Sequence, residues 1–221
     1  MRTLKKTRVK ICCIGSMQEA RLAIEYGAAA IGLVSSMPSG PGVIADGLIA
    51  QIARAAPPAV SSFLLTCQPE ASAIVAQQRR AGASAIQLCD RLASGSYAEL
   101  RRALPGVAIV QVIHVHGNEA VEQAVAVAAH VNGILLDSGN QSLTVKELGG
   151  TGRTHDWDVS RKICEAVDVP VFLAGGLNAC NVAEAIRHVR PFGVDVCSGV
   201  RTGGKLDEAK LSAFFDSVEN V

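Results

Sequence analysis

Two side chains that can move protons, the Cys12 thiol and the Asp137 carboxyl, each lie in a short apolar run that is typical of a buried β-strand. A thiol can act as a general base and a carboxyl as a general acid when their surroundings shift their pKa values towards neutrality. The pair therefore indicates acid–base chemistry if the fold brings the two segments together. Taken alone, Asp137 fits equally well a residue that caps the turn after its strand.

The adjacent cysteines Cys12 and Cys13 are expected to differ because side chains alternate along a strand. Lys10 and Cys12 then share one face, with Lys10 one layer below and able to favour the Cys12 thiolate. Cys13 is expected on the opposite face, against the helices, as a small apolar residue. Two cysteines that merely pack remain an alternative for this segment, but strand geometry favours Cys12 as the reactive thiol.

Glycines and polar residues follow the last two apolar runs of the chain, in residues 174–178 and 198–200. Backbone N–H groups at such glycines can approach an anion, and a helix that starts there adds a favourable partial charge. A tight strand-to-helix turn with Asn178 as its N-cap is the alternative. Because two successive loops carry the feature, we predict a phosphate site. Its residues are Gly175, Gly176, Asn178, Ser198 and Gly199.

These candidates must be positioned by short apolar runs that alternate with segments of helical periodicity. The expected strands are 8–14, 29–34, 60–66, 85–89, 108–115, 133–137, 171–174 and 193–197. The expected helices are 17–26, 48–56, 71–81, 97–103, 119–130, 159–166, 181–188 and 207–218. Continuously apolar strands are typical of a parallel sheet covered by helices.

We therefore predict an α/β protein whose residues 1–221 form a single (β/α)8 barrel domain, a TIM barrel. A doubly wound sheet is the weaker alternative. In a barrel, the carboxyl ends of all strands meet at one mouth, where binding groups collect. That mouth would bring together Cys12, Asp137 and the glycine loops.

The composition narrows the possible partners and the cellular location. The formal net charge is +1, so no overall field favours nucleic acid or an anionic membrane surface. No apolar stretch approaches the ~18 residues of a membrane span, and the start of the chain lacks an apolar signal-peptide core. The 7 cysteines are an odd number without a CxxC pair, which favours reduced thiols. We expect a cytoplasmic protein, a monomer or homodimer, with no nucleic acid and no membrane as partner.

Six segments together resemble the phosphoribosylanthranilate isomerase family over almost the whole chain. They are VKIC at 9–12, IQL at 86–88, LLDS at 135–138, GGTGRTHDW at 149–157, FLAGGLN at 172–178 and GVDVCSGV at 193–200. The resemblance implies a step of tryptophan biosynthesis, the Amadori rearrangement of the aminoaldose N-(5'-phosphoribosyl)anthranilate to an aminoketose. It implies a small phosphosugar as substrate, no cofactor and no metal.

The resemblance also implies roles for individual residues. Asp137 would be the general acid that protonates the ribose ring oxygen and opens the ring to a Schiff base. Cys12 would be the general base that removes the C2′ proton and leaves an enolamine. The substrate-binding residues would be Lys10, Gln87, Gly149, Gly150, Gly152, Arg153, Gly175, Gly176, Asn178, Ser198 and Gly199.

Several positions depart from the family pattern, and two of them bear on how the substrate carboxylate could be recognised. The family carries an arginine after the second strand that grips the anthranilate carboxylate, but residues 35–43 read SSMPSGPGV and no arginine lies between Arg21 and Arg54. The alternative function is therefore a paralogue that isomerises or merely binds a different phosphorylated sugar derivative. Arg201 stands where the family has glutamate, and we expect it to be a solvated residue at the start of a helix.

A metal-dependent barrel enzyme is a weaker alternative. Thiol, imidazole and carboxylate groups near the strand ends are types that bind zinc. Histidines satisfied by hydrogen bonds in the barrel wall explain the HxH pair more simply. The candidate ligands are Cys12, Cys89, His114, His116, Asp137 and Cys197.

Overall fold

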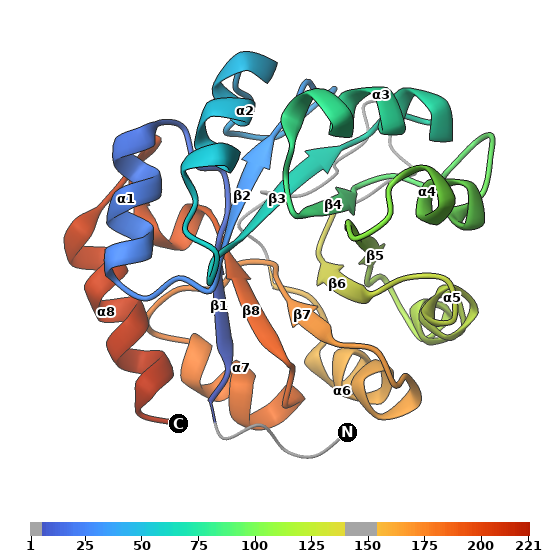
Figure 1. The fold of residues 1–221 in the computed structure, drawn as a ribbon. Helices are drawn as coiled ribbons and strands as arrows, with labels where there is room; N and C mark the ends of the chain where they lie inside the picture. The colour runs from blue at the N-terminus through green and yellow to red at the C-terminus, as the bar shows by residue number, and fades with distance from the viewer. Residues whose placement is uncertain (1–5, 140–153) are drawn as a thin grey trace.

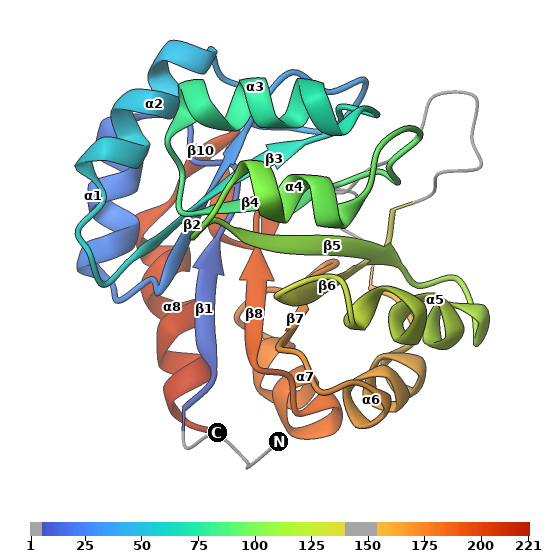
Figure 2. The ribbon, with the colours of Figure 1, turned by 45° about the vertical axis from the view of Figure 1, so that its right-hand side comes forward.

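Parallel strands form a closed barrel in chain order, with helices packed around its outside (Figure 1). The computed structural model describes residues 6–139 and 154–221. Each barrel strand pairs with its neighbours in the sequence, and β8 closes the ring on β1 (Figure 2). The predicted (β/α)8 fold class is confirmed.

The barrel strands are β1 (Arg8–Ile11), β2 (Ala30–Val34), β3 (Ser61–Thr66), β4 (Ala85–Leu88), β5 (Ala108–His114), β6 (Gly133–Asp137), β7 (Val171–Leu173) and β8 (Gly193–Val196). The helices are α1 (Met17–Glu25), α2 (Asp46–Ala55), α3 (Ala71–Ala81), α4 (Tyr97–Ala103), α5 (Glu119–Ala128), α6 (Trp157–Ala166), α7 (Val182–Val189) and α8 (Glu208–Glu219). A 3₁₀ turn, η1 (Ser198–Val200), and a hairpin of β9 (Arg201–Thr202) and β10 (Lys205–Leu206) follow β8. The sequence patterns did not predict this hairpin.

Each strand contributes side chains to two apolar layers, because its side chains alternate between the two faces. Ile11 and Leu64 belong to the layer between the barrel and the helices. Leu65, Leu135 and Phe172 belong to the layer inside the barrel. Burial of both faces explains why the strands are apolar at almost every position.

Aromatic rings fill the end of the barrel at which the strands begin. Phe63 and Phe172 meet edge to face with their centroids 6.0 Å apart, and Phe172 contacts Phe192 at 5.3 Å. Gly193 makes room for this cluster, since a Cβ there would lie 2.9 Å from the Phe172 ring. This packed floor leaves the opposite end of the barrel, where the strands end, for polar groups.

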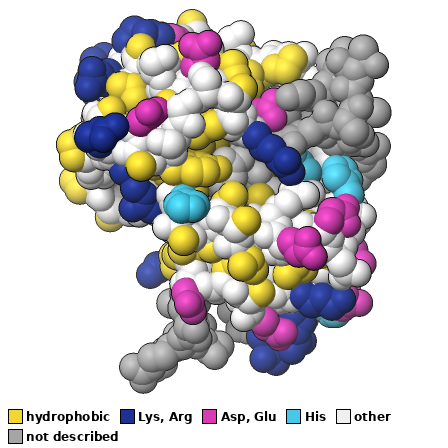
Figure 3. Space-filling model, turned by 90° about the vertical axis from the view of Figure 1, so that its right-hand side faces the viewer, with side chains coloured by type: hydrophobic (Ala, Val, Ile, Leu, Met, Phe, Trp, Pro, Cys, Tyr) yellow, Lys and Arg dark blue, Asp and Glu magenta, His cyan; other side chains and the backbone are white. Residues whose placement is uncertain are grey.

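The outer surface carries mixed charge. On the face drawn in Figure 3, basic and acidic side chains lie among one another rather than in a large patch of one sign. Within the described ranges, none of the helices combines the length and the apolar character that a membrane span requires.

The loops after β7 and β8 touch through their backbones. A Cβ added at Gly199 would lie 2.0 Å from the carbonyl oxygen of Leu177 and 3.0 Å from the Cα of Asn178. Only a glycine permits this approach, so Gly199 fixes how closely the two loops pack.

Replacing this glycine should therefore cost stability. We expect Gly199→Ala to lower the free energy of unfolding by about 1–3 kcal/mol, because backbone must shift to admit the methyl group. Gly47 is the matched control: it lies in α2, and nothing lies within 4 Å of an added Cβ. Gly47→Ala should raise stability by up to about 1 kcal/mol through helix propensity. Urea unfolding of both variants checks this, and equal stabilities would contradict it.

Candidate active site

A cavity opens at the end of the barrel where the strands finish. Loops after β1, β2, β7 and β8 line it together with side chains of β3, β4 and β6. Six residues predicted from the sequence line this cavity: Cys12, Gln87, Asp137, Gly175, Gly176 and Ser198. The fold therefore brings the candidate acid, the candidate base and most of the glycine loops to one place.

The other predicted residues lie elsewhere. Lys10 is fully buried below the cavity, and Gly199 packs behind it against the loop after β7. Asn178 stabilises that loop: its Oδ1 accepts a hydrogen bond from the N–H of Cys180 at 2.8 Å. Asn178 is not the N-cap of α7, because that helix starts at Val182 and Asn181 precedes it. Four predicted residues lie outside the described residues: Gly149, Gly150, Gly152 and Arg153.

Below the cavity, Lys10 and Asp195 form a buried ion pair. The Lys10 Nζ lies 2.9 Å from the Asp195 carboxylate, and the two residues are direct partners in the β1–β8 register. Burial alone would lower the pKa of Lys10, but the charge and hydrogen bond of Asp195 together with the neighbouring Cys12 outweigh it and the pKa is raised. Burial raises the pKa of Asp195, and Lys10 offsets part of that effect. Sequence reasoning missed Asp195, although a carboxylate inside an otherwise apolar strand was a usable signal.

Cys12 lies directly above this ion pair, as strand alternation predicted. A Cβ at Gly32, on the neighbouring strand, would lie 2.9 Å from the Cys12 Sγ and 3.2 Å from the Lys10 Nζ. Both groups therefore lie against the same glycine, on the inner face of the barrel. The Cys12 N–H donates to the carbonyl of Val196 at 2.8 Å, which continues the β1–β8 ladder one residue past the strand. Cys12 itself is 6% exposed.

The expectation that Cys13 faces the helices is wrong. β1 ends at Ile11, and Cys13 adopts a left-handed backbone conformation with φ of 60°, so strand alternation no longer applies to it. Its side chain lines the same cavity as Cys12. The pKa of the Cys13 thiol is raised because it lies beside the thiols of Cys12 and Cys197 and is buried. Its hydrogen bond to Cys197 lowers the pKa of that neighbour.

Asp137 ends β6 with its carboxyl in the cavity. It is 9% exposed, and burial raises its pKa to about 6. The N–H of Ser138 donates to its Oδ1 at 2.7 Å, which opposes part of that shift. A carboxyl with this pKa can hold and release a proton near neutral pH, as a general acid must.

The loops after β7 and β8 form one wall. Gly175 and Gly176 have φ values of 83° and 64°, which a residue with a side chain rarely adopts. Asn181 fixes this loop: its Oδ1 accepts from the N–H of Asn178 at 2.9 Å, and its Nδ2 donates to the carbonyl of Gly176 at 3.0 Å. Across the gap, Ser198 begins the η1 turn. Such loops can present backbone N–H groups to a phosphate.

The opposite wall comes from the loop after β2 and is largely apolar. Val34, Met37, Pro41 and Leu65 line the cavity there. Among residues 6–139 and 154–221, no lysine or arginine side chain lines the cavity. A carboxylate on a ligand would find no cationic partner on this wall, in agreement with the missing arginine of the loop.

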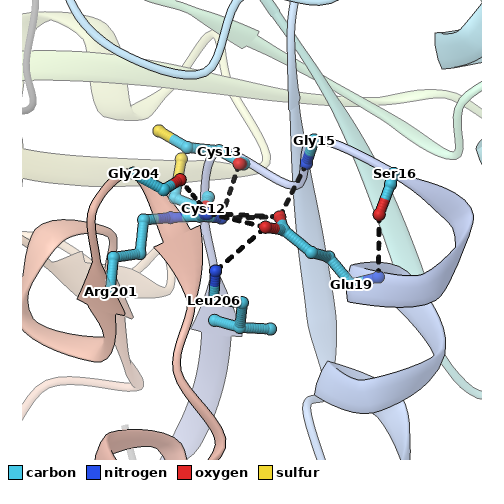
Figure 4. A network of polar contacts seen from close by, with 8 residues as sticks. All are labelled: Cys12, Cys13, Gly15, Ser16, Glu19, Arg201, Gly204 and Leu206. Carbon is cyan, nitrogen blue, oxygen red and sulfur yellow. Dashed lines mark hydrogen bonds and ion pairs between the residues drawn. The ribbon is translucent and has the colours of Figure 1, made fainter.

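Arg201 is not the solvated residue that we expected. Its side chain is 8% exposed and forms an ion pair with Glu19 at 3.1 Å (Figure 4). The guanidinium also donates hydrogen bonds to the backbone carbonyls of Cys12 and Cys13. Arg201 does not line the cavity. No local sequence pattern could predict this contact, because Glu19 lies 182 positions away.

Among the described residues, the candidate zinc ligands do not form a metal-binding group. Across the described part of the chain, no three His, Cys, Asp or Glu side chains are close enough to hold a metal ion. His114 and His116 line a different cavity, beside α4 and α5. The His114 ring nitrogen Nε2 lies 3.3 Å from the carbonyl of Cys89. The grouping at the barrel mouth is one of proton-transferring side chains.

Named relatives match nearly the whole chain. A family model described as N-(5'phosphoribosyl)anthranilate (PRA) isomerase matches residues 9–217. N-(5'-phosphoribosyl)anthranilate isomerase 2 of Methanosarcina mazei is 36% identical over 215 residues, which cover 96% of this chain and 94% of that protein. The N-(5'-phosphoribosyl)anthranilate isomerase of Haloferax volcanii is 37% identical over 212 residues, which cover 94% of this chain and 91% of that protein.

Solved structures agree with this match. N-(5'-phosphoribosyl)anthranilate isomerase from Pyrococcus furiosus gives a TM-score of 0.79 at 28% identity, and the match covers 97% of this chain and 100% of that chain. A phosphoribosyl anthranilate isomerase in complex with reduced 1-(o-carboxyphenylamino)-1-deoxyribulose 5-phosphate gives a TM-score of 0.78 at 27% identity, with the same coverage. The family predicted from the sequence motifs is confirmed. This chain belongs to the N-(5'-phosphoribosyl)anthranilate isomerase family.

Proposed function

We propose that this protein isomerises N-(5'-phosphoribosyl)anthranilate to the corresponding aminoketose, with Asp137 as general acid and Cys12 as general base. The observation that carries the proposal is one cavity that holds both groups, with the Asp137 carboxyl at a pKa of about 6. Family membership supplies the reaction, and the cavity supplies a residue for each of the first two proton transfers.

The first step needs a proton on the ribose ring oxygen. With a pKa of about 6, about a tenth of the Asp137 carboxyl groups carry a proton at pH 7. Transfer of that proton breaks the bond between C1′ and the ring oxygen. The oxygen keeps the electron pair of this bond and becomes the C4′ hydroxyl. The nitrogen lone pair forms the C1′–N double bond, and Asp137 is left as a carboxylate.

The second step removes the proton from C2′. The Cys12 thiolate accepts it, and the electron pair of the C–H bond moves to give the enolamine. The ammonium of Lys10 stays charged beneath Cys12 because its own pKa is raised. The enolamine then takes a proton at C1′ and loses one from the C2′ hydroxyl, which gives the ketone. Solvent carries the proton of Cys12 back to Asp137 and completes the cycle without a cofactor.

Other features indicate where the substrate phosphate binds and in which compartment the protein acts. Gly175, Gly176 and Ser198 provide the wall on which we place the substrate phosphate, with Gly199 packed behind it. None of the 7 cysteines forms a disulfide, which supports a reducing cytoplasm as the site of action.

A second candidate is an isomerase for a phosphosugar whose aglycone carries no carboxylate. The observation that favours it is the wall formed by Val34, Met37, Pro41 and Leu65, with no cationic side chain among the described residues of the cavity. The acid, the base and the phosphate wall would serve either substrate.

The general acid and base can be tested by substitution. We expect Cys12→Ala and Asp137→Asn each to lower kcat by about 100- to 10,000-fold, the range for loss of a positioned acid or base. The affinity of both variants for the analogue reduced 1-(o-carboxyphenylamino)-1-deoxyribulose 5-phosphate should change only a few-fold. Cys13→Gly is the matched control and should keep turnover, because glycine adopts φ of 60° readily. The assay follows the fluorescence of the anthranilate substrate, alongside complementation of a tryptophan auxotroph that lacks this enzyme. Full turnover in Cys12→Ala would exclude this cysteine as the base.

The raised pKa of Asp137 predicts how stability depends on pH. The unfolded carboxyl ionises near 3.8 and the folded one near 6, so the unfolded state binds fewer protons between these values. The contribution of Asp137 to the stability of the wild-type protein therefore falls as pH rises from about 4 to about 6, by roughly 3 kcal/mol. Asp137→Asn lacks this penalty and should be more stable than the wild type above pH 6 but not at pH 4. Urea unfolding across this range measures the difference, and a pH-independent difference would contradict the shift.

Because the wall is apolar, we expect the enzyme to discriminate weakly between substrates with and without a carboxylate on the aglycone. We expect kcat/KM for N-(5'-phosphoribosyl)aniline to lie within about 100-fold of the value for the anthranilate compound, because an apolar pocket discriminates weakly. Met37→Arg, which places a cation on the wall, should improve kcat/KM for the anthranilate compound alone. Complete loss of activity with the aniline compound would show that the wild-type site does grip the carboxylate.

A further inference from the structure

The turn after β1 sets the direction of the Cys12 side chain. Its backbone conformation is unfavourable for Cys13. Cys13 adopts a left-handed conformation, which costs a residue with a Cβ about 1–2 kcal/mol. Beyond it, the N–H of Ile14 donates to the carbonyl of Gly32 at 3.0 Å. The bonds of Cys12 and Ile14 thus continue the pairing of β1 with β8 and with β2 past the end of the strand, with Cys13 between them. Interactions from outside the turn can offset the cost of the left-handed conformation of Cys13.

Arg201 provides such interactions. One guanidinium nitrogen, Nη2, donates to the carbonyl of Cys12 at 3.2 Å and to that of Cys13. The other, Nη1, donates to the carbonyl of Gly204 at 3.0 Å, within the hairpin that carries Arg201. Figure 4 shows the guanidinium between the hairpin and the two cysteine carbonyls. A planar fork can make all of these contacts at once, whereas a single ammonium cannot.

Glu19 holds the guanidinium in place. Its carboxylate accepts from both terminal nitrogens of Arg201 at 3.1 Å, from the N–H of Gly15 at 2.8 Å and from the N–H of Leu206 at 2.9 Å. Burial alone would raise the pKa of Glu19, but these hydrogen bonds outweigh it and lower the pKa. The pair stays charged, and it ties the β9–β10 hairpin to the start of α1 and to the end of β1.

We propose that Arg201 is a positioning residue for the isomerisation: it holds the carbonyls of Cys12 and Cys13 and so aims the Cys12 sulfur into the cavity. The inference rests on the proposed function for its kinetic part. Arg201 does not line the cavity and both of its terminal nitrogens are occupied by protein groups, so it acts through Cys12 and not on the substrate. A shift of the base by about 1 Å can cost about 100-fold in rate.

The test compares Arg201→Met and Arg201→Lys with Arg161→Met. The control removes an exposed ion pair, Arg161–Glu165 at 3.0 Å, without touching the turn. At a temperature where each variant is folded by circular dichroism, we expect Arg201→Met to lose at least about tenfold in kcat with KM changed less than about twofold. Arg201→Lys should lie between Arg201→Met and the wild type, and the control should equal the wild type.

A readout without substrate separates this inference from the proposed function. Iodoacetamide alkylation of Cys12, located by mass spectrometry, is compared with alkylation of the exposed Cys180 in the same sample. Loosening of the turn should raise the Cys12-to-Cys180 ratio in both Arg201 variants and leave it unchanged in the Arg161→Met control.

Each outcome decides a separate question. Absence of turnover in the wild type sinks the proposed function, and the alkylation ratio then decides on Arg201 alone. An unchanged ratio, or an unchanged kcat in an active series, overturns the role of Arg201 even if the variants are less stable. A rise in KM without loss of kcat also overturns it, since that pattern indicates lost substrate binding. If Arg201→Met does not fold, Arg201→Lys decides by the same two readouts.

Discussion

The ion pair between Lys10 and Asp195 is the constraint on which the barrel mouth depends. Lys10 is fully buried, so its charge requires the Asp195 carboxylate 2.9 Å away. The pair joins β1 to β8, the strands that close the barrel, and it places a positive charge under Cys12. Breaking a buried pair typically costs about 3–5 kcal/mol, because one uncompensated charge is left behind. One interaction thus contributes to barrel closure and to the electrostatics of the candidate site.

In the loops above the pair, too, single residues serve more than one role. Gly32 leaves space for both Cys12 and Lys10, and Gly42, in the loop after β2, packs against Cys13. Asp137 owes its raised pKa mainly to burial in this crowded mouth. The burial that makes this carboxyl suitable for proton transfer also lowers the folding stability, as is common at functional sites. Packing, backbone conformation and charge are not separable here, because the same few residues carry all three.

The fold and the meeting of Cys12 and Asp137 in one cavity could be predicted from the sequence, because both depend on local patterns. Apolar runs located the strands, and alternation placed Cys12 above Lys10 on the inner face. The prediction failed at Cys13, where the strand ends early and a non-glycine residue adopts a left-handed φ that no sequence pattern announces. It failed at Arg201 because that contact joins residues far apart in the chain. Asp195 could have been found, since a buried lysine on a barrel strand requires a carboxylate partner nearby.

The roles proposed for Cys12 and Asp137 follow from the geometry of the cavity that both line. The most direct measurement is a crystal structure of the wild-type protein with reduced 1-(o-carboxyphenylamino)-1-deoxyribulose 5-phosphate bound. We predict the phosphate against Gly175, Gly176 and Ser198, the Cys12 sulfur beside C2′, and the Asp137 carboxyl beside the C4′ oxygen. A phosphate bound elsewhere, or Cys13 in place of Cys12 beside C2′, would contradict the assignment.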